Sequence, residues 1–167
     1  MHADVSTLVS QLADALLARG WRLACAESCT GGLIAAACTE RAGSSDWFER
    51  GVVSYSNEAK IALLGVPASL IAAHGAVSET VARAMAEGIV RSSGADLAVS
   101  VTGIAGPSGG TAAKPVGTVW FGFALRRDGG LDVQAEHQRF DGDRAQVRHA
   151  SVRHALQGLL QRVADAR

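Results

Sequence analysis

The sequence is poor in several residue types, and each scarcity excludes a class of protein. It has three cysteines among 167 residues, without metal-ligand spacing, so neither a disulfide framework nor a metal site is expected. Its 16 basic and 16 acidic residues cancel, so no basic face for nucleic acid is predicted. No apolar run reaches the roughly 18 residues of a membrane span, and residues 1–7 do not resemble a secretory signal. We therefore expect a cytoplasmic protein with reduced thiols, bound neither to nucleic acid nor to a membrane.

Apolar residues are abundant at 48%, which excludes intrinsic disorder. A chain of this length is typical of one domain, and we expect residues 1–167 to form it. Hydrophobic periodicity and turn signals predict helices over residues 5–16, 33–38, 57–64, 67–73, 78–92 and 143–164. They predict strands over residues 21–26, 51–55, 96–101, 116–125 and 131–140. This order predicts a single layered α/β domain with a mixed sheet flanked by helices.

Lysine is so scarce that its positions are informative. Lys60 and Lys114 are the only lysines, Tyr55 is the only tyrosine and Asn57 the only asparagine. Three of these four residues lie within residues 55–60. An ammonium group can lose its proton near neutral pH when it is desolvated, whereas a guanidinium cannot. We therefore interpret Lys60 as a candidate general base, with Tyr55 beside it to relay a proton or polarise a carbonyl group.

A second candidate segment, Glu27–Gly32, joins a predicted strand to a predicted helix. The start of a helix offers backbone N–H groups and the positive end of the helix dipole, which suits phosphate or an oxyanion. Ser28 would present its hydroxyl there, although a simple capped helix is an equally common use of such a turn. The expected substrate-binding residues of this turn are Cys29, Thr30, Gly31 and Gly32. None of the five histidines falls in a glycine-rich segment, so a Ser-His-Asp triad is not supported.

A third candidate is the glycine-rich loop that follows the predicted strand at 96–101. Ligand crevices of α/β sheets open at such strand ends, and glycine lets a ligand approach the backbone. The expected substrate-binding residues here are Thr102, Gly103, Gly106, Gly109 and Gly110. Arg144 and Arg148 lie one turn apart on the last predicted helix, where their forked donors suit a phosphate group. A solvated helix face is the alternative interpretation of these arginines.

Seven segments in one order resemble the CinA C-terminal domain family, and together they span nearly the whole chain. They are residues 26–32, 43–48, 55–60, 74–78, 103–107, 114–120 and 140–144. The resemblance implies hydrolysis of the carboxamide of nicotinamide mononucleotide to nicotinate mononucleotide and ammonia, without a cofactor. Because the chain shows no separate N-terminal domain, it is similar to the stand-alone amidases of the family.

We expect a metal-free mechanism in which a serine attacks the carboxamide and Lys60 takes its proton. The resemblance favours Ser45 as nucleophile. Ser28 has the better strand-to-helix setting and would otherwise bind the substrate, as would Asn57 and Arg144. Cys29 is a third candidate, because a helix N-terminus lowers the pKa of a thiol, although a small buried residue is the simpler interpretation.

Two functions of other classes remain open at this point. One is a pyridine-nucleotide-binding module without turnover, which ammonia release would exclude. The other is an accessory protein in competence or DNA damage, which the neutral charge disfavours. A related pyridine nucleotide is also an alternative substrate. A homodimer is expected because two-fold dimers are the commonest oligomers.

Overall fold

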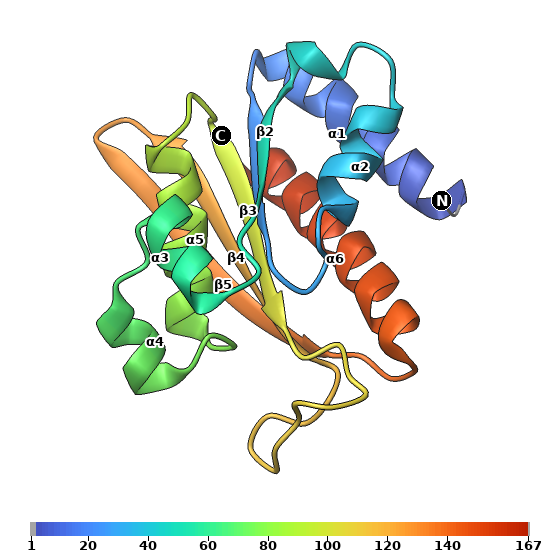
Figure 1. Cartoon of the computed structure of the whole chain (residues 1–167). Coiled ribbons are helices and arrows are strands. Elements are labelled where there is room, and N and C mark those ends of the chain that lie inside the picture. The colour runs from blue at the N-terminus through green and yellow to red at the C-terminus, as the bar shows by residue number, and fades with distance from the viewer. Residues whose placement is uncertain (1–2, 167) are drawn as a thin grey trace.

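The computed structural model describes residues 3–166 and has a five-stranded sheet with helices on both faces (Figure 1). The strands lie in the order β2-β1-β3-β4-β5. β1 pairs in parallel with β2 and with β3, whereas β4 pairs antiparallel with both of its neighbours, β3 and β5. The predicted α/β fold with a mixed sheet flanked by helices is confirmed. The elements are α1 (Ala3–Arg19), β1 (Leu23–Glu27), α2 (Leu33–Glu40), the 3-10 helix η1 (Ser44–Asp46), β2 (Phe48–Val53), α3 (Asn57–Leu64), α4 (Ala68–His74), α5 (Glu79–Arg91), β3 (Leu97–Gly103), β4 (Thr118–Arg127), β5 (Gly130–Arg139) and α6 (Arg144–Asp165).

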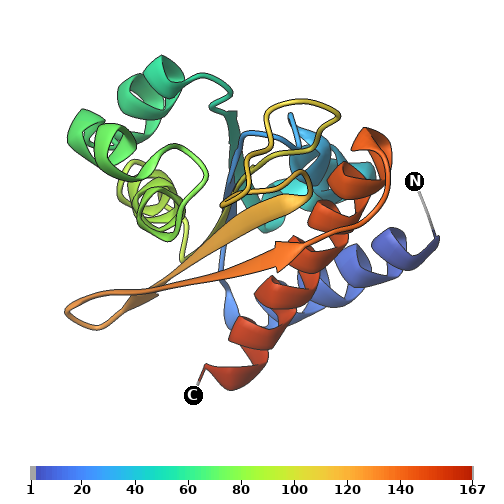
Figure 2. The ribbon, with the colours of Figure 1, turned by 90° about the horizontal axis from the view of Figure 1, so that it is seen from below.

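The two faces of the sheet carry side chains of different size. The face covered by α1, α2 and α6 is built from large apolar residues, among them Leu23, Leu97, Phe121 and Phe123. The face covered by α5 is built from alanines such as Ala24, Ala98 and Ala124. Figure 2 shows α1 and α6 on one side of the sheet and α3, α4 and α5 on the other. Alternation of side chains along each strand therefore divides the core into two layers.

Small strand residues bring α5 very close to the sheet. Ser100 of β3 donates a hydrogen bond to the carbonyl oxygen of Ala82 in α5, at 2.6 Å. A Cβ atom on Gly122 of β4 would lie 2.2 Å from the same carbonyl oxygen. No real Cβ tolerates that distance, so glycine at this position is required by the approach of the helix.

The predicted element order is correct, but the second strand is shifted. The sequence predicts it over residues 51–55, whereas β2 covers Phe48–Val53 and leaves Tyr55 beyond its end. β2 is an edge strand whose residues are all partly or fully exposed, so it lacks the apolar alternation that marks a strand in a sequence. Its limits are set instead by pairing with β1, from Leu23 against Phe48 to Glu27 against Val53. No helix within residues 3–166 is long and apolar enough to cross a membrane.

We expect Gly122→Ala to lower the free energy of unfolding by about 1–3 kcal/mol, because the added methyl group overpacks the contact with α5. Gly130→Ala is the matched control, since a Cβ there meets nothing within 4 Å. Urea denaturation of both variants measures the difference. Equal stability of the two variants would contradict the close contact.

Candidate active site

The candidate residues gather at the carboxyl ends of the parallel strands. Ser28 follows β1, Ser54 and Tyr55 follow β2, and Thr102 lies near the end of β3. The loop over residues 104–117 and the beginning of α6 lie at the same end of the sheet, which is the lower end in Figure 1. Crevices at the carboxyl ends of strands are the usual ligand sites of α/β sheets.

A buried lysine contacts a serine at this end of the sheet. Lys60 is 1% exposed, and its Nζ lies 3.0 Å from Ser28 Oγ. The same Nζ donates to the carbonyl oxygens of Ser54 and Tyr55, at 2.9 and 3.3 Å. Ser56 caps α3 by accepting the N–H of Ala59, which fixes the first turn of the helix that carries Lys60. The structure therefore brings Lys60 together with Ser28.

Burial lowers the pKa of Lys60 below its ordinary value of 10.5. Within residues 3–166, the ammonium group forms no ion pair with a carboxylate that would hold its proton. Burial without a counter-charge favours the neutral amine, which has a lone pair for the Ser28 hydroxyl proton. The geometry and the electrostatics both suit a general base next to a nucleophile.

Tyr55 contacts Ser28 and Lys60 through its backbone carbonyl, whereas its phenol points to Arg144. Its carbonyl oxygen accepts from Lys60 and lies 3.5 Å from Ser28 Oγ. Its side chain is 59% exposed, and the hydroxyl accepts from Arg144 Nη2 at 3.1 Å. Arg144 also donates to the Gly106 carbonyl at 2.8 Å. Tyr55 and Arg144 thus link three segments around the site.

Ser45 lies at the other end of the sheet from Lys60, contrary to the expected pairing. It belongs to η1, which precedes β2, and its carbonyl accepts from Arg22 at 3.5 Å. The six residues of β2 separate η1 from Ser54. At about 3.3 Å per residue, the strand alone spans roughly 20 Å. The sequence preference for Ser45 is therefore not supported by the geometry, and Ser28 is the serine in contact with Lys60.

The first N–H groups of α2 are bound by a side chain of the protein itself. Glu27, the last residue of β1, accepts hydrogen bonds from the N–H groups of Gly32, Ile34 and Ala35. These distances are 3.0, 3.1 and 2.9 Å. This role of Glu27 was not predicted, because the sequence places Glu27 after the predicted strand at 21–26, whereas in the structure it is the buried last residue of β1.

Two backbone N–H groups next to Ser28, those of Cys29 and Thr30, donate to no other residue in the part of the chain that the structure describes. The Thr30 hydroxyl is buried and also lacks a partner. Burial raises the pKa of the Cys29 thiol to about 11, so a reactive thiolate is disfavoured there.

The other predicted site residues either stabilise the fold or are exposed to solvent. Thr102 donates its hydroxyl proton to the Ala76 carbonyl at 2.9 Å and thereby holds the α4–α5 connection. Gly103 packs against β4, where a Cβ would lie 2.7 Å from Val119. Asn57 is exposed at the start of α3, and Gly109 and Gly110 are exposed in the loop. Within residues 3–166, none of these side chains forms a hydrogen bond with Ser28 or Lys60.

Two arginines of α6 lie beside the turn without a carboxylate partner in residues 3–166. Arg148 donates to the carbonyl oxygens of Cys29 and Thr30, at 3.1 and 3.3 Å. Arg144 donates to the phenol of Tyr55 and to the carbonyl of Gly106. Because both guanidinium groups contact only neutral acceptors, they leave positive charge at the site that an anionic ligand would neutralise.

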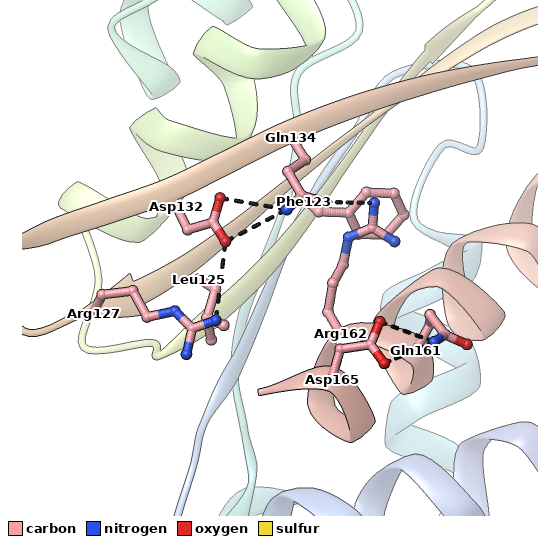
Figure 3. A pocket seen from close by; sticks show the side chains of 8 residues that line it. All are labelled: Phe123, Leu125, Arg127, Asp132, Gln134, Gln161, Arg162 and Asp165. Atoms are coloured by element: carbon pink, nitrogen blue, oxygen red, sulfur yellow. Dashed lines mark hydrogen bonds and ion pairs between the residues drawn. The ribbon is translucent and has the colours of Figure 1, made fainter. Parts of the chain in front are cut away.

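A hollow of about 220 Å³ lies against the C-terminal half of α6, away from Ser28 and Lys60 (Figure 3). Its lining residues are Phe123, Leu125, Arg127, Asp132, Gln134, Gln161, Arg162 and Asp165. Arg162 stacks over the Phe123 ring, and Asp132 lies between Arg127 and Gln134. The lining has no serine, cysteine or lysine, so it offers none of the nucleophile–base chemistry of the first site. The described chain also has no cluster of three metal-ligating side chains.

The chain is thus an α/β domain in which Ser28 and Lys60 are in contact at the carboxyl ends of the parallel strands. The model of the CinA C-terminal domain matches residues 5–163, so the chain belongs to this family.

Known proteins are similar in sequence and structure to this chain over almost its full length. The chain is 57% identical over 150 residues to the nicotinamide-nucleotide amidohydrolase PncC of Enterobacter agglomerans, covering 90% of each protein. It is 50% identical to PncC of Escherichia coli K12, covering 95% of this chain and 94% of that protein. The crystal structure of competence damage-inducible protein A of Klebsiella pneumoniae superposes with a TM-score of 0.92 at 42% identity, covering 98% of this chain and 99% of that chain.

The pKa of Lys60 can be measured directly because the chain has only two lysines. In Lys114→Arg protein labelled with 13C at lysine Cε, the single lysine resonance belongs to Lys60. We expect it to titrate below 10.5, because burial favours the neutral amine. In urea, where the amine is hydrated, the midpoint should return to the ordinary value. A midpoint at or above 10.5 in the folded protein would contradict the lowered pKa.

Proposed function

We propose that this protein hydrolyses the carboxamide of nicotinamide mononucleotide, giving nicotinate mononucleotide and ammonia. The observation that carries the proposal is the 3.0 Å contact between Ser28 Oγ and the buried Lys60 Nζ. An unactivated serine is a poor nucleophile, and a desolvated lysine is a base able to activate it. The choice of substrate is supported by the identity of 50–57% to proteins named nicotinamide-nucleotide amidohydrolase.

In the first step, Ser28 Oγ attacks the carboxamide carbon while its proton moves to the neutral Lys60 amine. The carbonyls of Ser54 and Tyr55 accept the other two Nζ protons, so the new ammonium has three acceptors. The tetrahedral oxyanion needs N–H donors, and those of Cys29 and Thr30 are the unused donors nearest along the chain. Such preorganised donors are each worth about 3 kcal/mol of transition-state stabilisation.

In the second step, the carbon–nitrogen bond breaks and the leaving group takes the proton from Lys60, which releases ammonia. The carboxyl group remains as an ester on Ser28. Lys60, neutral again, then removes a proton from a water molecule that attacks the ester. Cleavage returns the proton from Lys60 to Ser28 Oγ and frees the carboxylic acid, which releases its remaining proton to water and becomes the carboxylate. The enzyme thus ends in its starting protonation state.

Arg144 and Arg148 are the groups we assign to the phosphate of the nucleotide. They contact only neutral acceptors in residues 3–166, and they lie beside the turn that carries Ser28. The N-terminus of α2 is not available for this purpose because Glu27 fills it. A guanidinium group binds phosphate through paired N–H donors, which favours arginine over lysine in this role.

We expect Ser28→Ala and Lys60→Met to lower kcat by about a thousandfold or more, since each removes a partner of the reacting pair. Ser45→Ala is the matched control and should retain wild-type kcat. The rate of ammonia release from nicotinamide mononucleotide gives kcat for the wild type and for the three variants. Loss of activity in Ser45→Ala with retention in Ser28→Ala would overturn the assignment. Binding of the nucleotide without ammonia release by the wild type would instead indicate a binding module.

We expect Arg144→Gln to raise KM for nicotinamide mononucleotide by roughly ten- to a hundredfold, the usual effect of losing a charged hydrogen bond. Nicotinamide riboside, which lacks the phosphate, should be hydrolysed equally by the variant and the wild type. Arg153→Gln, on the same helix but paired with Asp4, is the control. Equal losses for the nucleotide and the riboside would place the phosphate elsewhere.

A further inference from the structure

Glu27 is an unusual group to find in the core, because its carboxyl group is 1% exposed and no cation pairs with it in the described chain. Its two oxygens receive four donors, the N–H groups of Gly32, Ile34 and Ala35 and the thiol of Cys25 at 3.5 Å. Both oxygens therefore act only as acceptors, as an ionised carboxylate does. The positive end of the α2 dipole is the charge that compensates it.

A carboxylate is more than a simple helix cap needs. A serine or aspartate at the N-cap would satisfy one of these N–H groups locally, and burying a full charge is costly. The N-cap position is instead Gly32, which offers no side chain to cap α2. The capping group comes from the end of β1, on the opposite side of the turn. Glu27 thus joins the last residue of the strand to the first turn of the helix.

The hydrogen bond from Gly32 to Glu27 closes the turn over residues 28–31, which carries Ser28. Ser28 N–H donates to the Val101 carbonyl at 2.9 Å, which fixes the turn to the sheet. Gly31 and Gly32 both have positive φ angles, 58° and 98°, so the backbone reverses sharply before α2. Ser28 is thus held by the sheet and Gly32 by Glu27, and between them the N–H groups of Cys29 and Thr30 donate to no other residue in the described chain.

We propose that Glu27 is the positioning residue of the reaction: by binding the start of α2 it holds the turn so that Ser28 Oγ meets Lys60 Nζ. The expected effect on the rate rests on the proposed function. The effect of Glu27 on the position of Ser28 relative to Lys60 does not. Glu27 touches neither substrate nor the reacting atoms. It acts through the backbone of the turn, and it leaves the phosphate-binding arginines in place.

Glu27→Gln is the decisive variant, because it keeps the shape of the side chain and replaces an acceptor oxygen with an N–H donor. One of the helix N–H groups then faces a donor, and the turn must shift. A displacement of about 1 Å is enough to lower a rate roughly a hundredfold. We therefore expect kcat for nicotinamide mononucleotide to fall by at least about tenfold, with KM changed by less than about twofold.

Three measurements separate positioning from stability. The first is kcat and KM at a temperature where the variant is fully folded by circular dichroism. The second is the rate at which a fluorophosphonate probe labels Ser28, and the third is the crystal structure of the variant. Val9→Ala, which thins the core under α1 away from the site, is the control for lost stability and should keep the wild-type labelling rate. Glu27→Asp, which keeps the charge but retracts it by one methylene, replaces Glu27→Gln if that variant does not fold.

The expected result is a lower labelling rate together with a lengthened Ser28–Lys60 contact in the crystal. A retained 3.0 Å contact, or an unchanged labelling rate with only a lower melting temperature, would overturn the proposal and leave Glu27 as a structural cap. Failure of the wild type to release ammonia would overturn the proposed function instead. In that case the crystal structure still decides whether Glu27 positions Ser28.

Discussion

The burial of Lys60 against Ser28 is the interaction on which the rest of the site depends. An amine that is 1% exposed, with two backbone carbonyls and one hydroxyl as its only partners in the described chain, is held in place without a counter-charge. That combination lowers its pKa and makes it a base. A carboxylate at the same distance would position the amine equally well and would keep it protonated.

Each element around the pair supplies one condition for this interaction. The carbonyls of Ser54 and Tyr55 follow the end of β2. Because α3 begins two residues later, at Asn57, the side chain of Lys60 in its first turn reaches both carbonyls. The end of β1 presents Ser28, and the start of α6 brings its arginines to the adjacent turn. Glu27, a buried carboxylate next to Ser28 in the chain, accepts hydrogen bonds from the N–H groups at the start of α2. The buried carboxylate therefore forms its hydrogen bonds with α2 and not with the Lys60 amine, which has no ion-pair partner in the described residues.

The sequence predicted the layered α/β fold because hydrophobic periodicity and turn residues mark most of its helices and strands. Lys60 was found because lysine is otherwise almost absent, and Ser28 because it lies between a strand and a glycine-containing helix start. The contact of Ser28 with Lys60 depends on whether β1 and β2 pair in parallel, and no local sequence pattern reports that. The parallel pairing places the residues that follow both strands at one end of the sheet and η1 at the other.

Two further features were out of reach of sequence patterns for physical reasons. Tyr55 contacts Lys60 through its carbonyl oxygen, which every residue type possesses, so the rarity of the phenol could not predict this contact. Glu27 caps a helix from the preceding strand, whereas familiar capping patterns use residues within the first turn of the helix itself. Both depend on how segments meet in space, which only the structure shows.

The most direct test of the serine–lysine site is to trap the covalent intermediate. The enzyme is mixed with nicotinamide mononucleotide, quenched in acid during turnover, digested and analysed by mass spectrometry. An ester of the nucleotide's carboxyl group on the peptide that contains Ser28, absent in Lys60→Met, is the predicted result. Turnover with the adduct on Ser45 or Cys29 would contradict it.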